Sequence, residues 1–215
     1  MVPTDRLLAF AAMSFLLIVV PGPSVLFVIG RALAQGRRAA LTTVAGNTVG
    51  AYVLVLAVAF GVGSIVERSV LVFTTLKLAG AAYLVYLGVK AWRGRGSLRA
   101  AFAEDVTAAA GHGGLRTFWE GFAVGVTNPK TIVFFAAVLP QFVDRGQGRV
   151  AAQMLLLGLV FNVIALVSDA VWGLVAATAR GWFARSPRRL SLVGGVGGLT
   201  MIGLGVTVAV TGRKD

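Results

Sequence analysis

Six long apolar stretches, separated by short connections rich in Arg, constrain the fold of this 215-residue chain more than any other feature. They extend over about residues 7–30, 39–66, 70–92, 118–143, 150–179 and 190–211. Each stretch can cross a bilayer as a helix, because about 20 residues span a hydrocarbon core of roughly 30 Å. None of them alternates with period two, which excludes the strands of a membrane barrel. The sequence therefore predicts an all-α integral membrane protein with six transmembrane helices.

Composition supports a lipid environment and excludes several classes of site. Hydrophobic residues make up 57% of the chain and charged residues only 13%, whereas about 25% of residues are charged in soluble domains. With no Cys and a single His, the chain has no ligand set for disulfides, a thiolate metal site or an iron–sulfur cluster. It also has no phosphate-binding loop of the Gly-x-x-x-x-Gly-Lys type. We therefore expect no metal, no cofactor, no ATP hydrolysis and no enzyme active site.

The basic residues predict the orientation of the spans. Connections on alternate sides of the membrane carry twelve and six Lys or Arg residues, and the richer side is expected to be cytoplasmic. The twelve are Arg31, Arg37, Arg38, Lys90, Arg93, Arg95, Arg99, Arg116, Arg180, Arg185, Arg188 and Arg189. Both termini would then lie outside. This distribution also explains the net charge of +12 without a nucleic-acid partner, because the basic residues do not gather on one water-facing surface.

The longest connection, about residues 93–117, divides a single transporter domain (1–215) into repeats at about 5–92 and 118–211. Each repeat has three spans, an odd number, so the second enters the membrane in the opposite orientation, as in inverted-topology transporters. Residues 21–27 (PGPSVLF) align without gaps with residues 128–134 (NPKTIVF), and both segments place proline in the first span of their repeat. We therefore predict a 3+3 inverted repeat in which helices 1 and 4 are broken.

The prolines should release backbone groups inside the membrane. Pro21 and Pro23 lack an amide donor and clash with the preceding turn, and Pro129 does the same in span 4. Such groups are tolerated only where protein or a wet cavity satisfies them, so the breaks should face the interior. Asn128 is typical of an N-cap before a first-turn proline, and Ser24 after Pro23 could restart span 1 similarly. The two half-helix N-termini would suit a carboxylate; the alternative is two simple kinks without a ligand.

A layer of polar residues accompanies the breaks. Pro23, Asn47, Asn128 and Asp169 lie about 8–10 residues from the cytoplasmic ends of their spans, or roughly 12–15 Å at 1.5 Å per residue. Asp169 is the only acid in a span interior, and a carboxylate at that depth is costly unless it is paired, protonated or hydrated. Such a group suits proton coupling. The alternative is a packing role, either as a fixed ion pair with Lys130 or through a hydrogen bond to Asn47.

Other polar residues give weaker indications. Lys77 in span 3 is a further candidate, although its long stem could reach the outer interface. Glu120 lies too near the cytoplasmic end of span 4 to need a special role, and His112, without a companion His or Cys, is expected to be solvated. Asn162 could bond across helices at a different depth. The three Gly-x-x-x-Gly spacings are no more than chance gives for 28 Gly, so the sequence does not support a homodimer.

Four segments resemble the LysE/RhtB family of amino-acid exporters. They are Pro21-Gly22-Pro23 in span 1, residues 77–88 (KLAGAAYLVYLG) in span 3, Asn128-Pro129-Lys130 in span 4, and residues 139–142 (LPQF) at its outer end. The resemblance covers essentially the whole chain. It implies a protein of the bacterial cytoplasmic membrane that exports amino acids or small derivatives in exchange for protons. It also points to the span 1 proline motif, residues 128–130 and Asp169 as site residues, whereas Glu120 departs from the family pattern.

Together these features predict a secondary active exporter that works by alternating access around a site between spans 1, 2, 4 and 5. The half-helix N-termini near Pro23 and Asn128, with Lys130, would hold the carboxylate of the substrate. Asp169 would bind the substrate ammonium or exchange a proton for it. The alternative is an efflux carrier or channel for a cation or another small solute, since carboxylate and amide oxygens suit a hard cation. The sequence does not indicate which amino acid is moved.

Overall fold

A computed structural model of the chain describes residues 2–62, 70–93 and 114–179, together with isolated positions between 182 and 210. These residues form helices and connecting turns, and none of them is in a strand. The α-helices are α1 (Thr4–Val19), α2 (Pro23–Gln35), α3 (Arg37–Ala57), α5 (Val70–Arg93), α7 (Gly114–Thr127), α8 (Pro129–Ala137) and α9 (Val150–Thr178). The π-helical turn η1 (Val58–Val62) follows α3, and the 3₁₀ turns η3 (Leu139–Phe142) and η4 (Arg145–Gln147) follow α8.

The described helices cover five of the six predicted apolar stretches. Two unbroken helices, Arg37–Gly61 and Val150–Thr178, are long and apolar enough to cross a membrane, and two bent helix pairs pass the same test when each is taken as one span. The stretch 190–211, apart from isolated positions, lies outside the described residues, as do the connection 94–113 with His112 and the side chain of Lys77. The arrangement of six helices in two repeats therefore stays a prediction.

Both predicted helix breaks are confirmed. The α1–α2 pair bends by 49° at the Pro21-Gly22-Pro23 segment, and the α7–α8 pair bends by 44° at Asn128 and Pro129. In both pairs the chain is helical before the proline segment and helical again after it. This is expected, because proline removes a backbone donor and blocks the preceding turn. The breaks thus divide two spans into half-helices that begin inside the bundle.

The capping residues show how the two breaks correspond. Gly22 caps α2 and Asn128 caps α8, and each cap carbonyl accepts a hydrogen bond from the amide four residues later, at 3.0 and 2.9 Å. A proline occupies the first position of both half-helices, Pro23 in α2 and Pro129 in α8. Gly22 therefore corresponds to Asn128. Pairing the two breaks by their caps shifts the ungapped alignment of residues 21–27 with 128–134 by one position.

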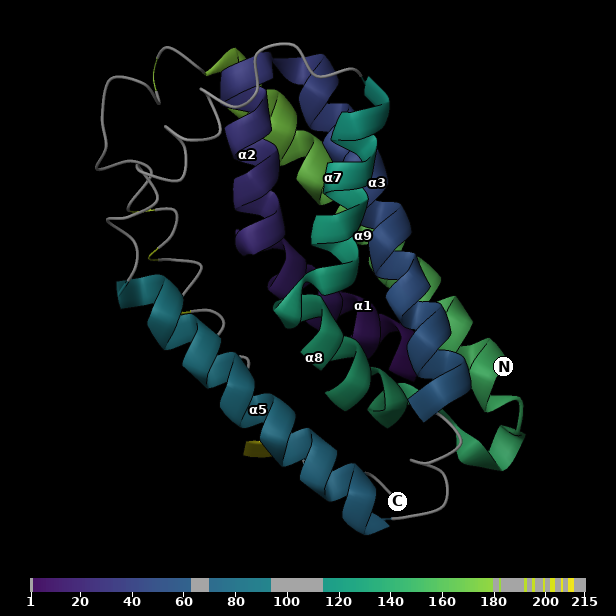
Figure 1. The fold of residues 1–215 in the computed structure, drawn as a ribbon. Helices are drawn as coiled ribbons and strands as arrows, with labels where there is room; N and C mark the ends of the chain where they lie inside the picture. Colours follow the sequence, from purple (N-terminus) through teal and green to yellow (C-terminus); the bar gives the residue numbers. More distant parts are fainter. Residues whose placement is uncertain are drawn as a thin grey trace.

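Helix ends gather at two ends of the bundle (Figure 1). The end of α2, the start of α3, the start of α7 and the end of α9 lie together at the top of the view, whereas α9 begins at the opposite end. Consecutive membrane spans must run in opposite directions, and these helix starts and ends agree with that requirement. Helix α5 runs beside α8, where Gly80 is so close that an added Cβ would lie 2.8 Å from the Cβ of Ala137.

Four glycines form a seam between α3 and α7, which we call the glycine seam. A Cβ at Gly46, Gly50, Gly121 or Gly125 would overlap the backbone of the facing helix. The overlapped carbonyls belong, in the same order, to Phe118, Phe122, Thr43 and Asn47. Two of the Gly-x-x-x-Gly spacings thus pack against each other within one chain, so their role in this fold is intramolecular. The seam holds the backbone of α7 directly against that of α3.

Aromatic side chains fill the core between α1, α8 and α9. The ring of Phe10 lies 5.8 Å from that of Phe134 and 5.3 Å from that of Phe142, between ring centroids. Phe135 and Phe161 meet edge to face at 4.7 Å. These are the separations at which aromatic pairs attract beyond the area they bury. The cluster therefore fixes the half-helix α8 against α1 and α9.

Candidate functional site

A small polar cavity lies where α2, α3, α8 and α9 meet beside the end of α1. Its volume is about 30 Å³, close to the share of one water molecule in the liquid. The polar side chains around it are Ser24, Asn47, Thr48, Asn128, Lys130, Thr131 and Asp169. Five of these were candidates from the sequence, and the fold brings them together. Pro21, Gly22, Pro23 and Pro129 do not line the cavity; they shape the two breaks beside it.

Lys130 binds a backbone carbonyl that the first break releases. Its ammonium donates a hydrogen bond of 2.9 Å to the carbonyl of Val20, just after the last residue of α1. The last carbonyls of a helix have no amide partner in the same helix, so an external donor must satisfy them when they are buried. The Lys130 side chain passes over Gly22, where an added Cβ would lie 3.0 Å from Cδ and 3.2 Å from Nζ. The prediction that the broken backbone needs an internal partner is therefore confirmed at Val20.

Asn128 joins the two half-helix N-termini. Its Oδ1 accepts a hydrogen bond of 3.1 Å from the backbone amide of Lys130, which confirms the predicted N-cap of α8. Its Nδ2 donates to the Oγ of Ser24 in the first turn of α2, at 3.0 Å. One amide side chain therefore satisfies the start of α8 and contacts the start of α2. Both half-helices consequently direct their N-terminal ends toward the cavity.

Asn47 and Asp169 form the other side of the cavity. The Nδ2 of Asn47 donates a hydrogen bond of 3.0 Å to Oδ2 of Asp169, and the two residues are 6% and 3% exposed. Of the two structural contacts considered for Asp169, this hydrogen bond is the one observed, since the Lys130 ammonium binds Val20 instead. The Oδ1 of Asn47 is buried without a hydrogen-bond partner among the described residues. An unpaired acceptor beside a buried carboxylate offers a place for a donor.

The cavity brings opposite charges close without neutralising them directly. Lys130 is 6% exposed and Asp169 is 3% exposed, and each has a neutral hydrogen-bond partner. Charges in such a low-dielectric region interact more strongly than in water, so a zwitterion between them would meet a complementary charge at each end. No group of three or more His, Cys, Asp or Glu side chains that could hold a metal occurs in the described part of the chain.

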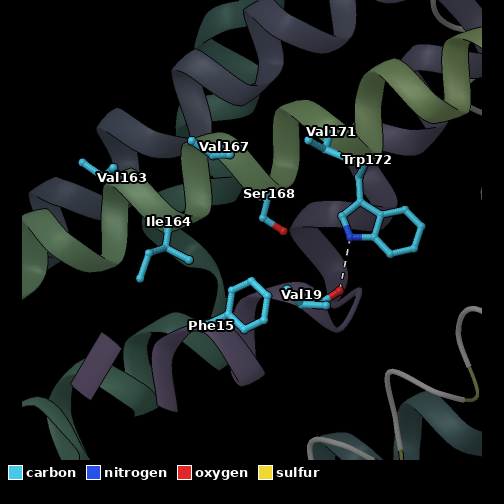
Figure 2. A pocket seen from close by; sticks show the side chains of 8 residues that line it. All are labelled: Phe15, Val19, Val163, Ile164, Val167, Ser168, Val171 and Trp172. Carbon is cyan, nitrogen blue, oxygen red and sulfur yellow. Dashed lines mark hydrogen bonds between the residues drawn. The ribbon is translucent and has the colours of Figure 1, made fainter. Parts of the chain in front are cut away.

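A larger pocket lies on the other side of the end of α1. It has a volume of about 560 Å³ and is formed by α1 and α9, with Phe15, Val163, Val167 and Val171 among its walls (Figure 2). Figure 2 shows the indole of Trp172 pointing to the carbonyl of Val19, to which its Nε1 donates a hydrogen bond of 3.2 Å. Among the described residues that line it, Ser168 supplies the only polar side chain apart from this indole. The described lining of the pocket therefore carries none of the charges that the amino and carboxyl groups of an amino acid need.

Sequence reasoning missed an ion pair at the end of the bundle where α2 stops and α7 starts. Arg31 was counted as part of a connection, but it lies inside α2, and its side chain is 6% exposed. Its guanidinium pairs with the carboxylate of Glu120, which also accepts a bond of 3.0 Å from Arg116. Glu120, for which the sequence indicated no special role, is thus the partner of two Arg side chains. The position of Glu120 near a span end hid this role, although a lone acid facing an Arg-rich end was a usable signal.

Asn162 lies outside the cavity. It is 3% exposed, and its Nδ2 donates to the carbonyl of Gly158 at 2.9 Å in its own helix. Gly158 is pressed against Val55 of α3, where an added Cβ would overlap that side chain. The bond predicted across helices is therefore replaced by a bond within α9. Asn162 belongs to the α3–α9 packing rather than to the polar layer.

Comparison with known proteins gives one family and several relatives. The family model described as "LysE type translocator" matches residues 15–212. The chain is 32% identical over 194 residues to a homoserine/homoserine lactone efflux protein of Salmonella typhimurium, covering 90% of this chain and 91% of that protein. An uncharacterized membrane protein of Vibrio cholerae is 30% identical over 203 residues, or 94% and 95% of the two chains. A leucine efflux protein of Salmonella choleraesuis is 27% identical over 128 residues, which cover 60% of this chain and 58% of that protein. No solved structure matches the chain.

Proposed function

This chain belongs to the LysE family of translocators, which are transporters and not enzymes, and we propose that it exports amino acids or small amino-acid derivatives across the bacterial cytoplasmic membrane. The observation that carries the proposal is the buried cavity in which Lys130, Asp169 and two half-helix N-termini meet. Relatives named as efflux proteins for homoserine, homoserine lactone and leucine support the substrate class.

Each group around the cavity has a role that follows from its charge. The substrate carboxylate would bind near the amide ends of α2 and α8, where the helix dipoles favour an anion, and near the Lys130 ammonium. The substrate ammonium would bind Asp169 and the free Oδ1 of Asn47, which lie across the cavity from Lys130. In the absence of substrate, Asp169 would take up a proton, since an unpaired buried carboxylate is costly in its charged form.

Proton exchange would supply the energy for export. One proton that enters down a membrane potential of 100 mV releases about 2.3 kcal/mol, enough for roughly a 50-fold gradient of a zwitterionic substrate. The same carboxylate would release the proton inside and bind the substrate ammonium, so the two cargoes would alternate at Asp169. This mechanism needs no nucleotide and no metal.

Transport would proceed by alternating access in a six-helix bundle of two inverted repeats. The 49° and 44° bends of the two broken pairs, and their matching caps at Gly22 and Asn128, support the repeat. A cavity of about 30 Å³ is too small for an amino acid, so helices must separate for the substrate to bind. The excess of Lys and Arg in alternate connections supports a topology with both termini outside.

An efflux assay in whole cells tests the proposal. The chain is expressed in a bacterium that lacks its own amino-acid exporters, the cells are loaded with dipeptides, and the released amino acids are measured by mass spectrometry. We expect faster release of a defined set of amino acids, lost in Asp169→Asn and in the presence of a protonophore. Asp144→Asn is the matched control, because this carboxylate binds the amide of Gly146 in the turn before α9 and lies away from the cavity.

The outcomes separate the alternatives. If no amino acid leaves faster although the protein is inserted, the substrate class is wrong, and a cation or another small solute becomes the alternative to test. If Asp169→Asn keeps the wild-type rate and pH dependence, Asp169 has no part in coupling. Equal release with and without a protonophore would contradict proton exchange while leaving export itself intact.

A further inference from the structure

A second polar cluster lies on α2 and α7, away from the cavity. Arg31 is eight residues after Pro23 in α2, which places it about 12 Å along the helix from the break at 1.5 Å per residue. This end of the bundle is the one predicted to face the cytoplasm. Substrate that leaves the cell must pass this end before it reaches the cavity.

Arg31 is a buried charge with a defined partner. The guanidinium pairs with Glu120 on α7, and its Cζ lies 5.0 Å from the ring centre of Phe27, one turn earlier in α2. Glu120 is partly exposed and has a second partner in Arg116, which is exposed. Removing one member of a buried ion pair is strongly unfavourable, because the other charge is left alone. Arg31 therefore requires an anionic group at this position in any conformation in which it stays buried.

Two buried donors beside this ion pair have no acceptor. The Nε of Arg31 and the Nε2 of Gln35 are both buried and without a hydrogen-bond partner among the described residues. Arg31 and Gln35 are four residues apart in α2, so they lie on the same face of the helix. An unmade hydrogen bond costs the full desolvation of a buried polar group. Two such donors on one face indicate that an acceptor belongs there.

We propose that Arg31, Gln35 and Glu120 form an intake site for the charged head group of the substrate, an inference that rests on the function proposed above. The substrate carboxylate accepts hydrogen bonds from Arg31 and Gln35, and the substrate ammonium binds Glu120. A zwitterion suits this exchange because it gives each member of the opened ion pair a new partner of opposite charge. A cation without a carboxylate would bind Glu120 but leave Arg31 without an anion, so it should bind this site more weakly than the zwitterion.

Binding at this site also loosens a contact between the two broken spans. The Arg31–Glu120 pair connects α2, the second half of span 1, to α7, the first half of span 4. When the zwitterion takes over both charges, this direct connection is lost. Substrate arrival would thus weaken the contact that holds the half-helices together at the predicted cytoplasmic end.

Gln35 provides the sharpest test, because its side chain takes no part in the ion pair. Inside-out membrane vesicles that contain the full chain are supplied with L-leucine, L-homoserine and their carboxylate-free counterparts L-leucinamide and L-homoserine lactone. For Gln35→Glu we expect the half-saturating concentration of the amino acid to rise about tenfold, since a charged hydrogen bond is replaced by repulsion. The amide or lactone should keep its wild-type value. Gln147→Glu, at an exposed position of η4, is the matched control.

Glu120→Gln separates the two ends of the substrate. This variant should raise the half-saturating concentration of the acid and of its carboxylate-free counterpart alike, because both molecules carry the ammonium. If Gln35→Glu changes neither compound, or changes both equally, the intake site is refuted while export by the wild type still supports the proposed function. Glu104 and Asp105 are the acids of the connection 94–113, which lies outside the described residues. If replacing both, as Glu104→Gln and Asp105→Asn, removes the effect of Gln35→Glu, a carboxylate of the chain rather than the substrate occupies the donors, and the intake site is refuted. Wild-type vesicles that take up none of the four compounds would overturn both proposals.

Discussion

Gly22 allows a direct test of the contact between Lys130 and the broken end of α1. The backbone of Gly22 has φ −98° and ψ −169°, an extended conformation that any residue adopts, so Gly22→Ala introduces no backbone strain. The new Cβ would lie 3.0 Å from the Cδ of Lys130 and 3.2 Å from its Nζ. The lysine must therefore move by a few tenths of an ångström, away from a position in which its ammonium binds the Val20 carbonyl at 2.9 Å.

The expected cost follows from that hydrogen bond. Complete loss of a charged donor from a buried carbonyl costs about 2 kcal/mol of unfolding free energy. A displaced lysine should therefore cost at most this amount, which corresponds to a fall of at most about 4–8 °C in the unfolding midpoint for a chain of this size. Thermal unfolding of the purified protein in detergent measures it. Gly114→Ala is the matched control, because an added Cβ there meets no atom of the described part of the chain within 4 Å.

A double-mutant cycle decides whether the effect acts through the lysine. In a Lys130→Met background the Val20 carbonyl has already lost its donor, and the flexible Met side chain can move aside. Gly22→Ala should then have little further effect. An equal fall of the midpoint in both backgrounds, or no fall in the wild-type background, would refute the assignment of this contact.

Three further substitutions test other parts of the structure. Asn128→Ala should lower the unfolding free energy by about 1 kcal/mol through loss of the N-cap, whereas Asn128→Asp, which keeps the acceptor, should lose less; denaturation in detergent compares them. Arg31→Ala should destabilise the protein by about 2 kcal/mol because it removes a buried charged hydrogen bond, and Arg116→Ala by at most about 1 kcal/mol because Arg116 is exposed; equal effects would contradict the buried pair. Gly125→Leu should prevent α3 and α7 from meeting, seen as loss of a monodisperse peak in size-exclusion chromatography, while Gly114→Leu should keep it.

The features that follow from covalent structure were predictable from the sequence. Proline cannot donate a backbone hydrogen bond, so the breaks at Pro21, Pro23 and Pro129 could be predicted without knowing the fold. The residues around the cavity were predictable for a related reason. Asn47 and Asp169 are polar in otherwise apolar spans, and burial in lipid is costly enough that such residues must turn inward and find partners.

Features that depend on which faces meet were not predictable. A lone acid at an Arg-rich end indicates an ion pair, but periodicity is lost when a span is apolar all round. The sequence therefore could not indicate which Arg faces Glu120 or that Gln35 lies beside it. The register of the two breaks was not defined by the sequence, because a segment with two prolines around Gly22 and a segment with one proline after Asn128 can be aligned in more than one way. The partner of each Gly-x-x-x-Gly spacing was likewise undefined until α3 and α7 were placed together.

The glycine seam has a consequence for how this protein tolerates sequence variation. Gly125 faces the backbone of Asn47, so the residue that binds Asp169 is held in place by a position that has no side chain at all. A deep mutational scan scored by export should therefore find residues 46, 50, 121 and 125 as intolerant as the charged residues around the cavity. At these positions even a methyl group is excluded, and the restriction comes from shape alone. Selection for export would thus fix four residues that never contact the substrate.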